Sequence, residues 1–394
     1  MASGAKSESG PIAVARRLSE SRPSSRGCGA STKDDRAETN IAPRIRLWEP
    51  GTCGWCTVAS CLRLRDRKLG RLDRSKGDAG IDRAAIQRVL DDARSVTALR
   101  SILVVKNGAL VGEQYYGGVT ASDLQGVNSV TKSVASMLVG IAIQQGRIKG
   151  LSETVATLLP SSASKAPGAA ALSMTLEQIL NDTSGLVYDY RVDQRALDTA
   201  EDPVAFVLGL PVDPQKVGQW VYNDAAISLL SPILVQAQGM PIDQLAQRDL
   251  FRPLGIERVE AARDKAGNFM SYRGLRLRAR DLAKIGWSIA NDGRWGDKEI
   301  VPKDWVRTST SFHVPTTWST APMQKTGYGY LWFTGSLNGH PVAWAWGYGA
   351  QFVVVVPSLR LAVTTTATNP HPRDLNAQNN AVMAVVARIV AVAV

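Results

Sequence analysis

A serine and a lysine three positions apart, Ser129 and Lys132, are the residues of this sequence whose types and spacing could support nucleophilic catalysis. They open an apolar, helix-like stretch, and a helix places side chains three positions apart on the same face. Burial would favour the neutral form of the lysine, and a neutral amine can take the proton of a serine hydroxyl. At the first turn of a helix, the serine N–H would also be free to stabilise an oxyanion.

The Ser-x-x-Lys pattern alone is weak evidence, because it recurs in this chain. It also occurs at Ser3 in a polar segment and at Ser162 in a loop rich in Ser, Ala and Pro. Only Ser129 opens an amphipathic helix. The alternative for any one match is a solvated serine and lysine with no catalytic role.

Other common catalytic patterns are missing from the sequence. There is no Gly-x-Ser-x-Gly elbow, no phosphate-binding loop and no dinucleotide fingerprint. The three histidines, His313, His340 and His371, have no metal-ligand spacing. We therefore expect neither a metal nor an organic cofactor, and a catalytic serine would need a base other than histidine.

The pattern of apolar residues predicts the elements that must position this pair. An Asn-Gly turn between two β-rich runs predicts a hairpin early in the chain, and further β-rich runs lie near its end. Helices are expected over residues 82–93, 129–145, 176–180, 224–238, 243–250, 279–290 and 376–394, and strands over 101–106, 109–116, 330–334, 352–356 and 361–366. This order is α+β. It fits an antiparallel sheet built from both chain ends, flanked by helices, with an inserted helical region over about 151–325.

Four segments resemble one known family. The stretch NSVTKSVASMLVGIAIQQGRI around Ser129 is similar to the serine-helix segment of the serine β-lactamase-like family, which includes penicillin-binding proteins, class C β-lactamases, esterases and 6-aminohexanoate-dimer hydrolases. Three more matches follow in the family's order: TLEQILNDTSGL from Thr175, WVYNDAAISLL from Trp220, and WGYGAQFVVVVP from Trp346. The resemblance covers about residues 80–390 and implies a β-lactamase/transpeptidase-like fold.

The resemblance also implies roles for particular residues. Ser129 would be the nucleophile, and Lys132 and Tyr222 would move protons, with either of the two as the formal base. Taken alone, Tyr222 could equally be a core tyrosine. The residues expected to contact the substrate or its oxyanion are Asp224, Gly347, Tyr348, Gly349, Ala350 and Tyr188.

Two positions depart from the family pattern. Asp224 stands where family members usually carry Asn, and its charge could keep Lys132 protonated and shift the base role to Tyr222. A literal Lys-Thr-Gly begins at Lys325, but the stretch from Gly347 has the right strand pair downstream, so Lys325 is interpreted as a loop residue. The site would then lack a cation for a substrate carboxylate, which favours esters or amides over classical β-lactams.

Residues 1–77 are interpreted as a basic, partly irregular extension, and residues 78–394 as the catalytic domain. The extension carries 16 Lys/Arg and 8 Asp/Glu of the chain's 46 and 35. It also holds all four cysteines, Cys28, Cys53, Cys56 and Cys61, which are interpreted as structural or incidental, with a redox pair as the alternative. The extension lacks the aromatic-interleaved basic pattern of a nucleic-acid site, so no nucleic-acid partner is expected.

No apolar run reaches the ~20 residues of a membrane span, so no transmembrane segment is expected. Residues 381–394 are instead predicted to form a packed terminal helix. The absence of a clear signal peptide slightly favours a cytoplasmic location.

The predicted function is a serine hydrolase that cleaves a small ester or amide, like an esterase or a nylon-oligomer hydrolase. A β-lactamase or D-aminopeptidase is the alternative within the same chemistry. Two alternatives of other classes are a non-catalytic binder of peptidoglycan-like or acyl ligands with the same fold, and nucleic-acid binding through residues 1–77.

Overall fold

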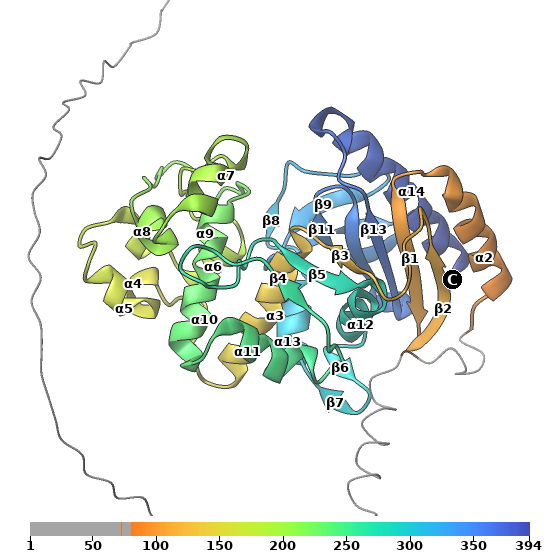
Figure 1. Ribbon diagram of the computed structural model, residues 1–394, viewed down its shortest axis with the longest axis horizontal. Helices are drawn as coiled ribbons and strands as arrows, with labels where there is room; N and C mark the ends of the chain where they lie inside the picture. Colours follow the sequence, from red (N-terminus) through yellow and green to blue (C-terminus); the bar gives the residue numbers. More distant parts are fainter. Residues whose placement is uncertain (1–71, 73–79) are drawn as a thin grey trace, which may run out of the picture. The chain divides into compact units, whose positions relative to one another are not determined.

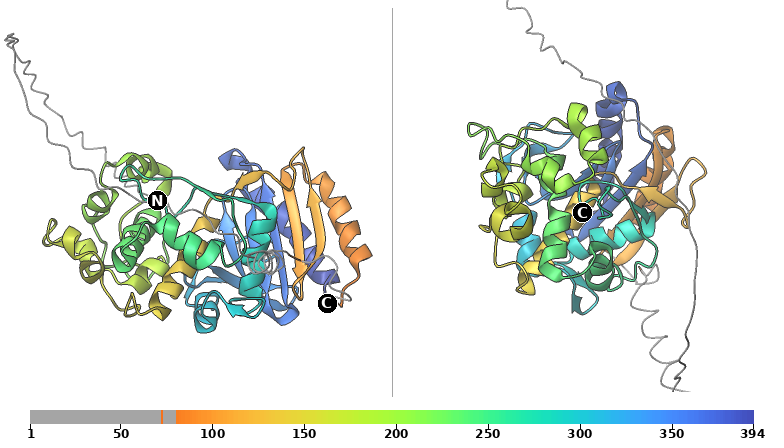
Figure 2. Two further views of the ribbon diagram at one scale, coloured as in Figure 1. Left: turned by 60° about the horizontal axis from the view of Figure 1, so that its bottom comes forward. Right: turned by 60° about the vertical axis from the view of Figure 1, so that its left-hand side comes forward.

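The computed structural model describes Leu72 and residues 80–394 (Figure 1). The interpretations of residues 1–77 and of their cysteines therefore lie outside the described residues, apart from Leu72. The described segments are built around one antiparallel sheet with helices on both sides (Figures 1 and 2). The α+β architecture expected from the sequence is thus confirmed.

The central sheet joins the two ends of the described chain. Its eight strands run in the order β2-β1-β13-β12-β11-β10-β9-β8, so the first hairpin pairs with the last strand. The bounds are β1 (Leu99–Lys106), β2 (Ala109–Tyr115), β8 (Val314–Pro315), β9 (Gln324–Tyr328), β10 (Phe333–Leu337), β11 (His340–Gly347), β12 (Gln351–Val356) and β13 (Leu361–Ala367). The middle strands β12 and β13 are almost entirely buried, which explains their continuous runs of Val, Leu, Ala and Thr.

Helices cover both faces of this sheet (Figure 2). On one face, α2 (Arg83–Asp92) packs on β2, and α14 (Leu375–Val392) packs on β13 and on α2. On the other face, α12 (Ala279–Ala290) crosses β13 and β12, and Gly286 allows it to approach the side chains of Val353 and Ala362 closely. The long helix α3 (Val130–Gln144) packs on β11 and β12.

Helix α3 is the structural axis between the sheet and the helical region. Every residue from Val130 to Ala142 is buried, whereas the sequence predicted a one-sided apolar stripe. The difference arises because α3 packs on three neighbours: the sheet, α10 (Leu230–Gln238) and α13 (Lys303–Ser309). A helix enclosed in this way is apolar all round, so its few polar residues are notable.

The helical region forms the side of the domain farthest from α2 and α14 (Figure 1). Its helices are α4 (Val155–Leu158), α5 (Pro160–Ala163), α6 (Leu176–Leu180), α7 (Tyr190–Thr199), α8 (Pro203–Leu208), α9 (Asp224–Ser228), α10 (Leu230–Gln238) and α11 (Ile242–Ala246), the last continued by a π-helical turn Gln247–Phe251. Short strands complete the fold: β3 (Leu124–Gly126), β4 (Glu260–Ala261) and β5 (Leu275–Arg278) form one small sheet, and β6 (Arg294–Trp295) and β7 (Lys298–Glu299) form another.

Most predicted elements are found near their expected positions, but the predicted bounds of one strand were wrong. The strand expected over 330–334 begins only at Phe333, because residues 329–332 form a tight turn in which Leu331 has φ +61° and the Gly329 N–H donates to the Trp332 carbonyl. Strand β11 was not anticipated. The helix expected over 224–238 is divided at Leu229 into α9 and α10.

The C-terminal helix is packed, as expected. By length and composition alone, Pro372–Val392 (21 residues, mean hydropathy 1.2) could cross a membrane, but 44% of its most apolar window is buried within the domain. Val382, Val386 and Ile389 are fully buried.

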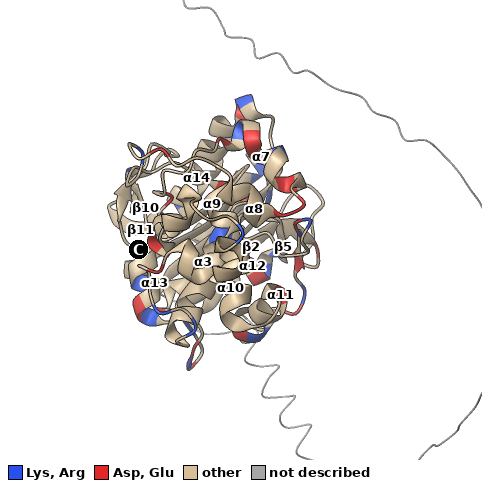
Figure 3. Ribbon diagram, turned by 90° about the vertical axis from the view of Figure 1, so that its left-hand side faces the viewer, with Lys and Arg blue, Asp and Glu red and all other residues tan. Residues whose placement is uncertain are grey.

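Charge on the described domain is mixed in sign. Figure 3 shows Lys and Arg interspersed with Asp and Glu on α7 and α13. Charged side chains elsewhere on the domain also form exposed ion pairs, such as Arg263 with Asp243 of α11. Pairs of this kind contribute little to stability.

Close packing of α3 against α13 gives a stability prediction. A Cβ added at Gly140 would lie 2.2 Å from the Trp305 ring. We expect Gly140→Ala to lower the free energy of unfolding by about 1–3 kcal/mol, because overpacking outweighs the helix propensity gained. Denaturant unfolding measures this change. Gly150→Ala, where no atom lies within 4 Å, is the matched control and should be nearly neutral; equal effects at both positions would contradict the packing.

Candidate active site

Ser129 lies in a tight turn directly before α3. The preceding residue, Asn128, has φ +48°, a conformation that Asn tolerates better than most residues. Its amide donates to the Tyr348 carbonyl (2.8 Å), and its carbonyl accepts from the Thr131 hydroxyl (2.6 Å). These bonds fix the turn, so the Ser129 side chain is presented at the start of the buried helix.

Lys132 lies one turn into α3, where it is 2% exposed. Its Nζ makes three polar contacts: the Tyr272 carbonyl at 2.7 Å, Asp224 Oδ1 at 2.6 Å and Ser129 Oγ at 3.0 Å. The predicted meeting of Ser129 and Lys132 on one helix face is present in the structure.

Tyr222 comes from the distant segment before α9, and its hydroxyl donates to Ser129 Oγ at 2.6 Å. The neighbouring Asn223 holds this segment in place, because its Oδ1 caps α9 by accepting from the Ala226 N–H and its amide donates to the Leu186 carbonyl. A hydroxyl, an amine and a phenol from separate parts of the chain therefore meet within hydrogen-bond distance.

Burial is the largest influence on the pKa of Lys132. Removal from water lowers the pKa of Lys132 below its ordinary value of 10.5, because burial disfavours the charged amine. The Asp224 carboxylate acts in the opposite direction and raises the pKa of Lys132, but burial is the larger effect. Asp224 is itself buried at the first residue of α9.

The pKa of Tyr222 is shifted upward, in the direction opposite to that of Lys132. Burial, reinforced by the charge of Asp224, raises the pKa of Tyr222 well above 10.0. The phenol therefore keeps its proton at rest. Of the two base candidates left open by the sequence, these directions favour Lys132 over Tyr222.

The stretch from Gly347 borders the serine turn. Gly347 ends β11, and a Cβ there would lie 2.3 Å from the Val127 carbonyl oxygen. The turn from Tyr348 to Ala350 follows, with φ +80° at Gly349 and +64° at Ala350, and leads into β12. The end of β11 therefore lies beside the turn that carries Ser129.

The interpretation of Lys325 as a loop residue was wrong, because Lys325 lies on strand β9. Its side chain is exposed. The Gly347 element, and not Lys325, is the one that borders the turn carrying Ser129.

Tyr188 is placed differently from its neighbour Tyr190. The Tyr188 hydroxyl donates to Gln194 Oε1 at 3.2 Å, inside the helical region. Tyr190 instead meets the Tyr222 ring edge-on, with 5.7 Å between ring centroids. Contact with the Tyr222 ring therefore comes from Tyr190.

The structure adds three residues that the sequence did not single out: Asp182, Tyr272 and Trp318. Asp182 is 1% exposed, and it accepts the Asn223 N–H through Oδ1 and the Val221 N–H through its carbonyl. Its position directly before the Thr-Ser-Gly motif could have indicated a role for Asp182 from the sequence. Tyr272 contacts Lys132 through its backbone carbonyl. Because every residue has such a carbonyl, this contact could not be inferred from the sequence.

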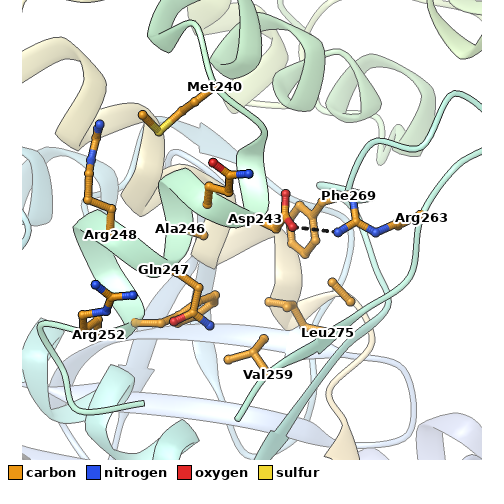
Figure 4. Close-up of a pocket in the computed structure, with 13 residues that line it drawn as sticks. Met240, Asp243, Ala246, Gln247, Arg248, Arg252, Val259, Arg263, Phe269 and Leu275 are labelled. Carbon is orange, nitrogen blue, oxygen red and sulfur yellow. Dashed lines mark hydrogen bonds and ion pairs between the residues drawn. The ribbon is translucent and has the colours of Figure 1, made fainter. Parts of the chain in front are cut away.

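A cavity of about 560 Å³ lies elsewhere, beneath α11 and the β4–β5 pair (Figure 4). Arg263 and Asp243 form an ion pair at 2.8 Å on its wall. Ser129, Lys132 and Tyr222 are not among its lining residues. Within residues 80–394 there is also no cluster of three His, Cys, Asp or Glu side chains that could hold a metal ion.

Comparisons with known proteins agree with this geometry. The family model described as "Beta-lactamase" matches residues 84–388. The putative penicillin-binding protein PbpX of Bacillus subtilis (strain 168) is 24% identical over 179 residues, 43% of each chain. The 6-aminohexanoate-dimer hydrolase of Paenarthrobacter ureafaciens is 22% identical over 230 residues, 56% of this chain and 59% of that protein. These matches span about half the length of the two relatives.

The fold is shared with a solved structure. A putative 6-aminohexanoate-dimer hydrolase from Bacillus anthracis superposes with a TM-score of 0.63 at 16% identity, covering 82% of this chain and 85% of the other. This likeness concerns the fold alone.

Asp182 yields a pH-dependent stability prediction. Burial raises the pKa of its carboxyl well above 3.8, so the folded state binds that proton more tightly than the unfolded state. The contribution of the Asp182 carboxyl to the free energy of unfolding is therefore fully present below pH 3.8. It is lost as the pH rises from 3.8 through the pKa of this carboxyl in the folded state. Asp182→Asn keeps an oxygen that can accept the Asn223 N–H. The amide does not ionise, so the variant does not lose stability in this way as the pH rises.

We expect the Asp182→Asn variant to be more stable than the parent protein by about 1 kcal/mol or more at neutral pH. The difference should shrink toward zero in acid. Urea unfolding across a pH series measures it, and a variant less stable at neutral pH would refute the assignment.

Proposed function

The chain belongs to the beta-lactamase family, and from this premise we propose that it is a serine hydrolase that cleaves an ester or amide through an acyl-enzyme on Ser129. One observation carries the proposal. Ser129 Oγ lies 3.0 Å from Lys132 Nζ and 2.6 Å from the Tyr222 hydroxyl, although the tyrosine is 93 positions away in sequence. A nucleophile within hydrogen-bond reach of a base and an acid is the arrangement that acyl transfer requires.

The contacts of Lys132 indicate which way the protons run. The Tyr272 carbonyl accepts an N–H of the amine, the Asp224 carboxylate lies 2.6 Å from the nitrogen as an ion-pair partner, and neither group has a proton to donate. Ser129 is the one contact of Lys132 that has a proton to donate. In the neutral amine, the nitrogen lone pair can accept this hydroxyl proton. Because Tyr222 donates to the same oxygen, the hydroxyl protons point in one direction, from Tyr222 to Ser129 to Lys132.

The reaction follows from this order. Ser129 Oγ attacks the carbonyl carbon while Lys132 takes the serine proton. The C–O or C–N bond to the leaving group breaks, and the leaving group receives a proton from Tyr222, which regains one from the Lys132 ammonium. Water then attacks the acyl-enzyme, giving a proton to Lys132, and the acid leaves as Ser129 Oγ recovers its hydrogen.

The oxyanion is assigned to two backbone N–H groups. One belongs to Ser129 at the entrance of α3, and the other to the turn from Tyr348 to Ala350. Donors aimed at the developing charge typically contribute about 10²–10³-fold in rate. The close approach of Gly347 to Val127 supports this assignment, because it brings the end of β11 beside the serine turn.

The charges around the site favour an uncharged substrate. Lys132 is occupied by its three contacts, Arg273 is paired with Asp198, and Lys325 is exposed on β9. Among residues 80–394, these three side chains offer no spare cation for a substrate carboxylate, which favours neutral esters and amides over classical β-lactams.

Ser129→Ala tests the proposal. We expect turnover of p-nitrophenyl esters to fall by at least ~10³-fold and labelling by a fluorophosphonate probe to vanish, because the nucleophile is gone. Ser162→Ala, in the second internal Ser-x-x-Lys, is the matched control and should leave both unchanged. Unchanged turnover in the Ser129→Ala variant would refute the mechanism. Ligand binding with no turnover in the parent protein would favour a non-catalytic binder.

Asp224→Asn tests the proton order. The Asp224 carboxylate raises the pKa of Lys132, so its removal should lower that pKa further. The acidic limb of kcat/KM, which reports loss of the Lys132 proton, should then move to lower pH. A shift to higher pH would show that Lys132 is not the base. Asp243→Asn, which changes a carboxylate paired with Arg263 at the separate cavity, should not shift this limb.

A further inference from the structure

Trp318 is stacked on the catalytic tyrosine. The indole and the Tyr222 ring have centroids 4.6 Å apart and planes inclined by 25°. Trp318 belongs to the irregular segment between β8 and β9, which carries no residue of the four family motifs. Neither the sequence nor the resemblance assigned it a role.

The segment around Trp318 is anchored at both ends. The Trp318 N–H donates to the Thr316 hydroxyl at 3.0 Å. On the other side, Asn380 of α14 accepts hydrogen bonds from the Thr320 hydroxyl (3.1 Å) and from the Ala321 N–H (2.8 Å). The indole is therefore held in place from the C-terminal helix, independently of the segment that carries Tyr222.

The indole connects the two halves of the domain. From the helical region it meets Tyr190 and Trp220 edge-on, at centroid distances of 6.0 and 5.6 Å. From the sheet it meets Trp346 of β11 edge-on at 6.1 Å. Trp346 directly precedes Gly347, so the same indole contacts both the tyrosine and the strand that borders the oxyanion position.

The Tyr222 oxygen lies on the Cβ–Cγ axis of a rigid ring, so rotation about χ2 leaves it in place, and its distance to Ser129 depends on the direction of that axis. A partner stacked on the face of the ring restrains tilting of the axis. The ring is restrained by Trp318, by the edge contact with Tyr190, and by Lys132 Nζ, 4.7 Å from its centroid. Among these, Trp318 is the partner that stacks on the ring and does not move protons.

We propose that Trp318 is a positioning residue, which holds the Tyr222 ring so that its hydroxyl stays on Ser129 Oγ and is shielded from water. This inference rests on the proposed function and extends it to a residue outside the family motifs. Stacking of offset aromatic rings provides both the orientation and the exclusion of water.

Two substitutions separate stacking from simple packing. Trp318→Phe keeps an aromatic face and should retain most of the activity. Trp318→Leu keeps an apolar side chain without that face, and its kcat should fall by about 10–100-fold with KM changed by less than about threefold, as expected for a misplaced acid. Phe312→Leu is the control for an aromatic-to-aliphatic change in the segment leading to β8, where Phe312 is 60% exposed, and it should change neither constant.

The pH profile gives a readout that packing alone would not move. In the Trp318→Leu variant, water reaches the phenol, so the raised pKa of Tyr222 should fall toward 10.0 and an alkaline decline of kcat should appear nearer that pH. A rise in KM with kcat and the alkaline limb unchanged would overturn the proposal and make Trp318 a substrate-contacting or packing residue.

A second measurement does not require turnover. Ultraviolet titration of phenolate absorbance, with Tyr222→Phe subtracted, reports the ionisation of Tyr222 directly. Trp318→Leu should lower its midpoint and Trp318→Phe should not. If the parent protein has no hydrolytic activity but this midpoint shifts, the proposed function fails and the positioning role stands; if activity is present and the midpoint does not shift, the positioning role fails.

Discussion

The burial of one amine organises the whole site. Lys132 lies inside a helix that is enclosed on all sides, and an amine in such a place is tolerated only with good partners. The Tyr272 carbonyl, Asp224 and Ser129 supply them. The three partners come from the segment before β5, from the start of α9 and from the turn before α3, so satisfying one nitrogen brings together three regions of the fold.

This constraint explains why apparently structural residues matter to the chemistry. Asp182 holds the backbone of Val221 and Asn223, and Asn223 in turn caps α9, which presents Asp224. Asn128 ties the serine turn to the strand end at Tyr348. Loss of any of these contacts would change the distances among Ser129, Lys132 and Tyr222.

The part of the site that sequence could predict consists of side chains with distinctive chemistry in fixed local patterns. Ser129 and Lys132 are neighbours on a helix, and Tyr222 lies in a recognisable motif, so their meeting was foreseeable. Tyr272 was not, because its contribution is a backbone carbonyl, which every residue possesses. Trp318 was not, because its place depends on hydrogen bonds to Asn380, far along the chain. Similarly, the strand expected at 330–334 failed because local β propensity does not reveal that Leu331 turns with positive φ.

The pairing of β1 with β13 places Leu99 opposite Ala367, and Lys106 reaches the carbonyl of Ala393 at 2.7 Å. The last strand, β13, lies between β1 and β12, so the centre of the sheet is incomplete until this strand has paired. Pairing between segments so far apart in sequence is slow to form. On the ribosome, the hydroxyl, amine and phenol are all synthesised well before the strand that completes the sheet behind them. The central sheet therefore cannot be completed until β13 has been synthesised.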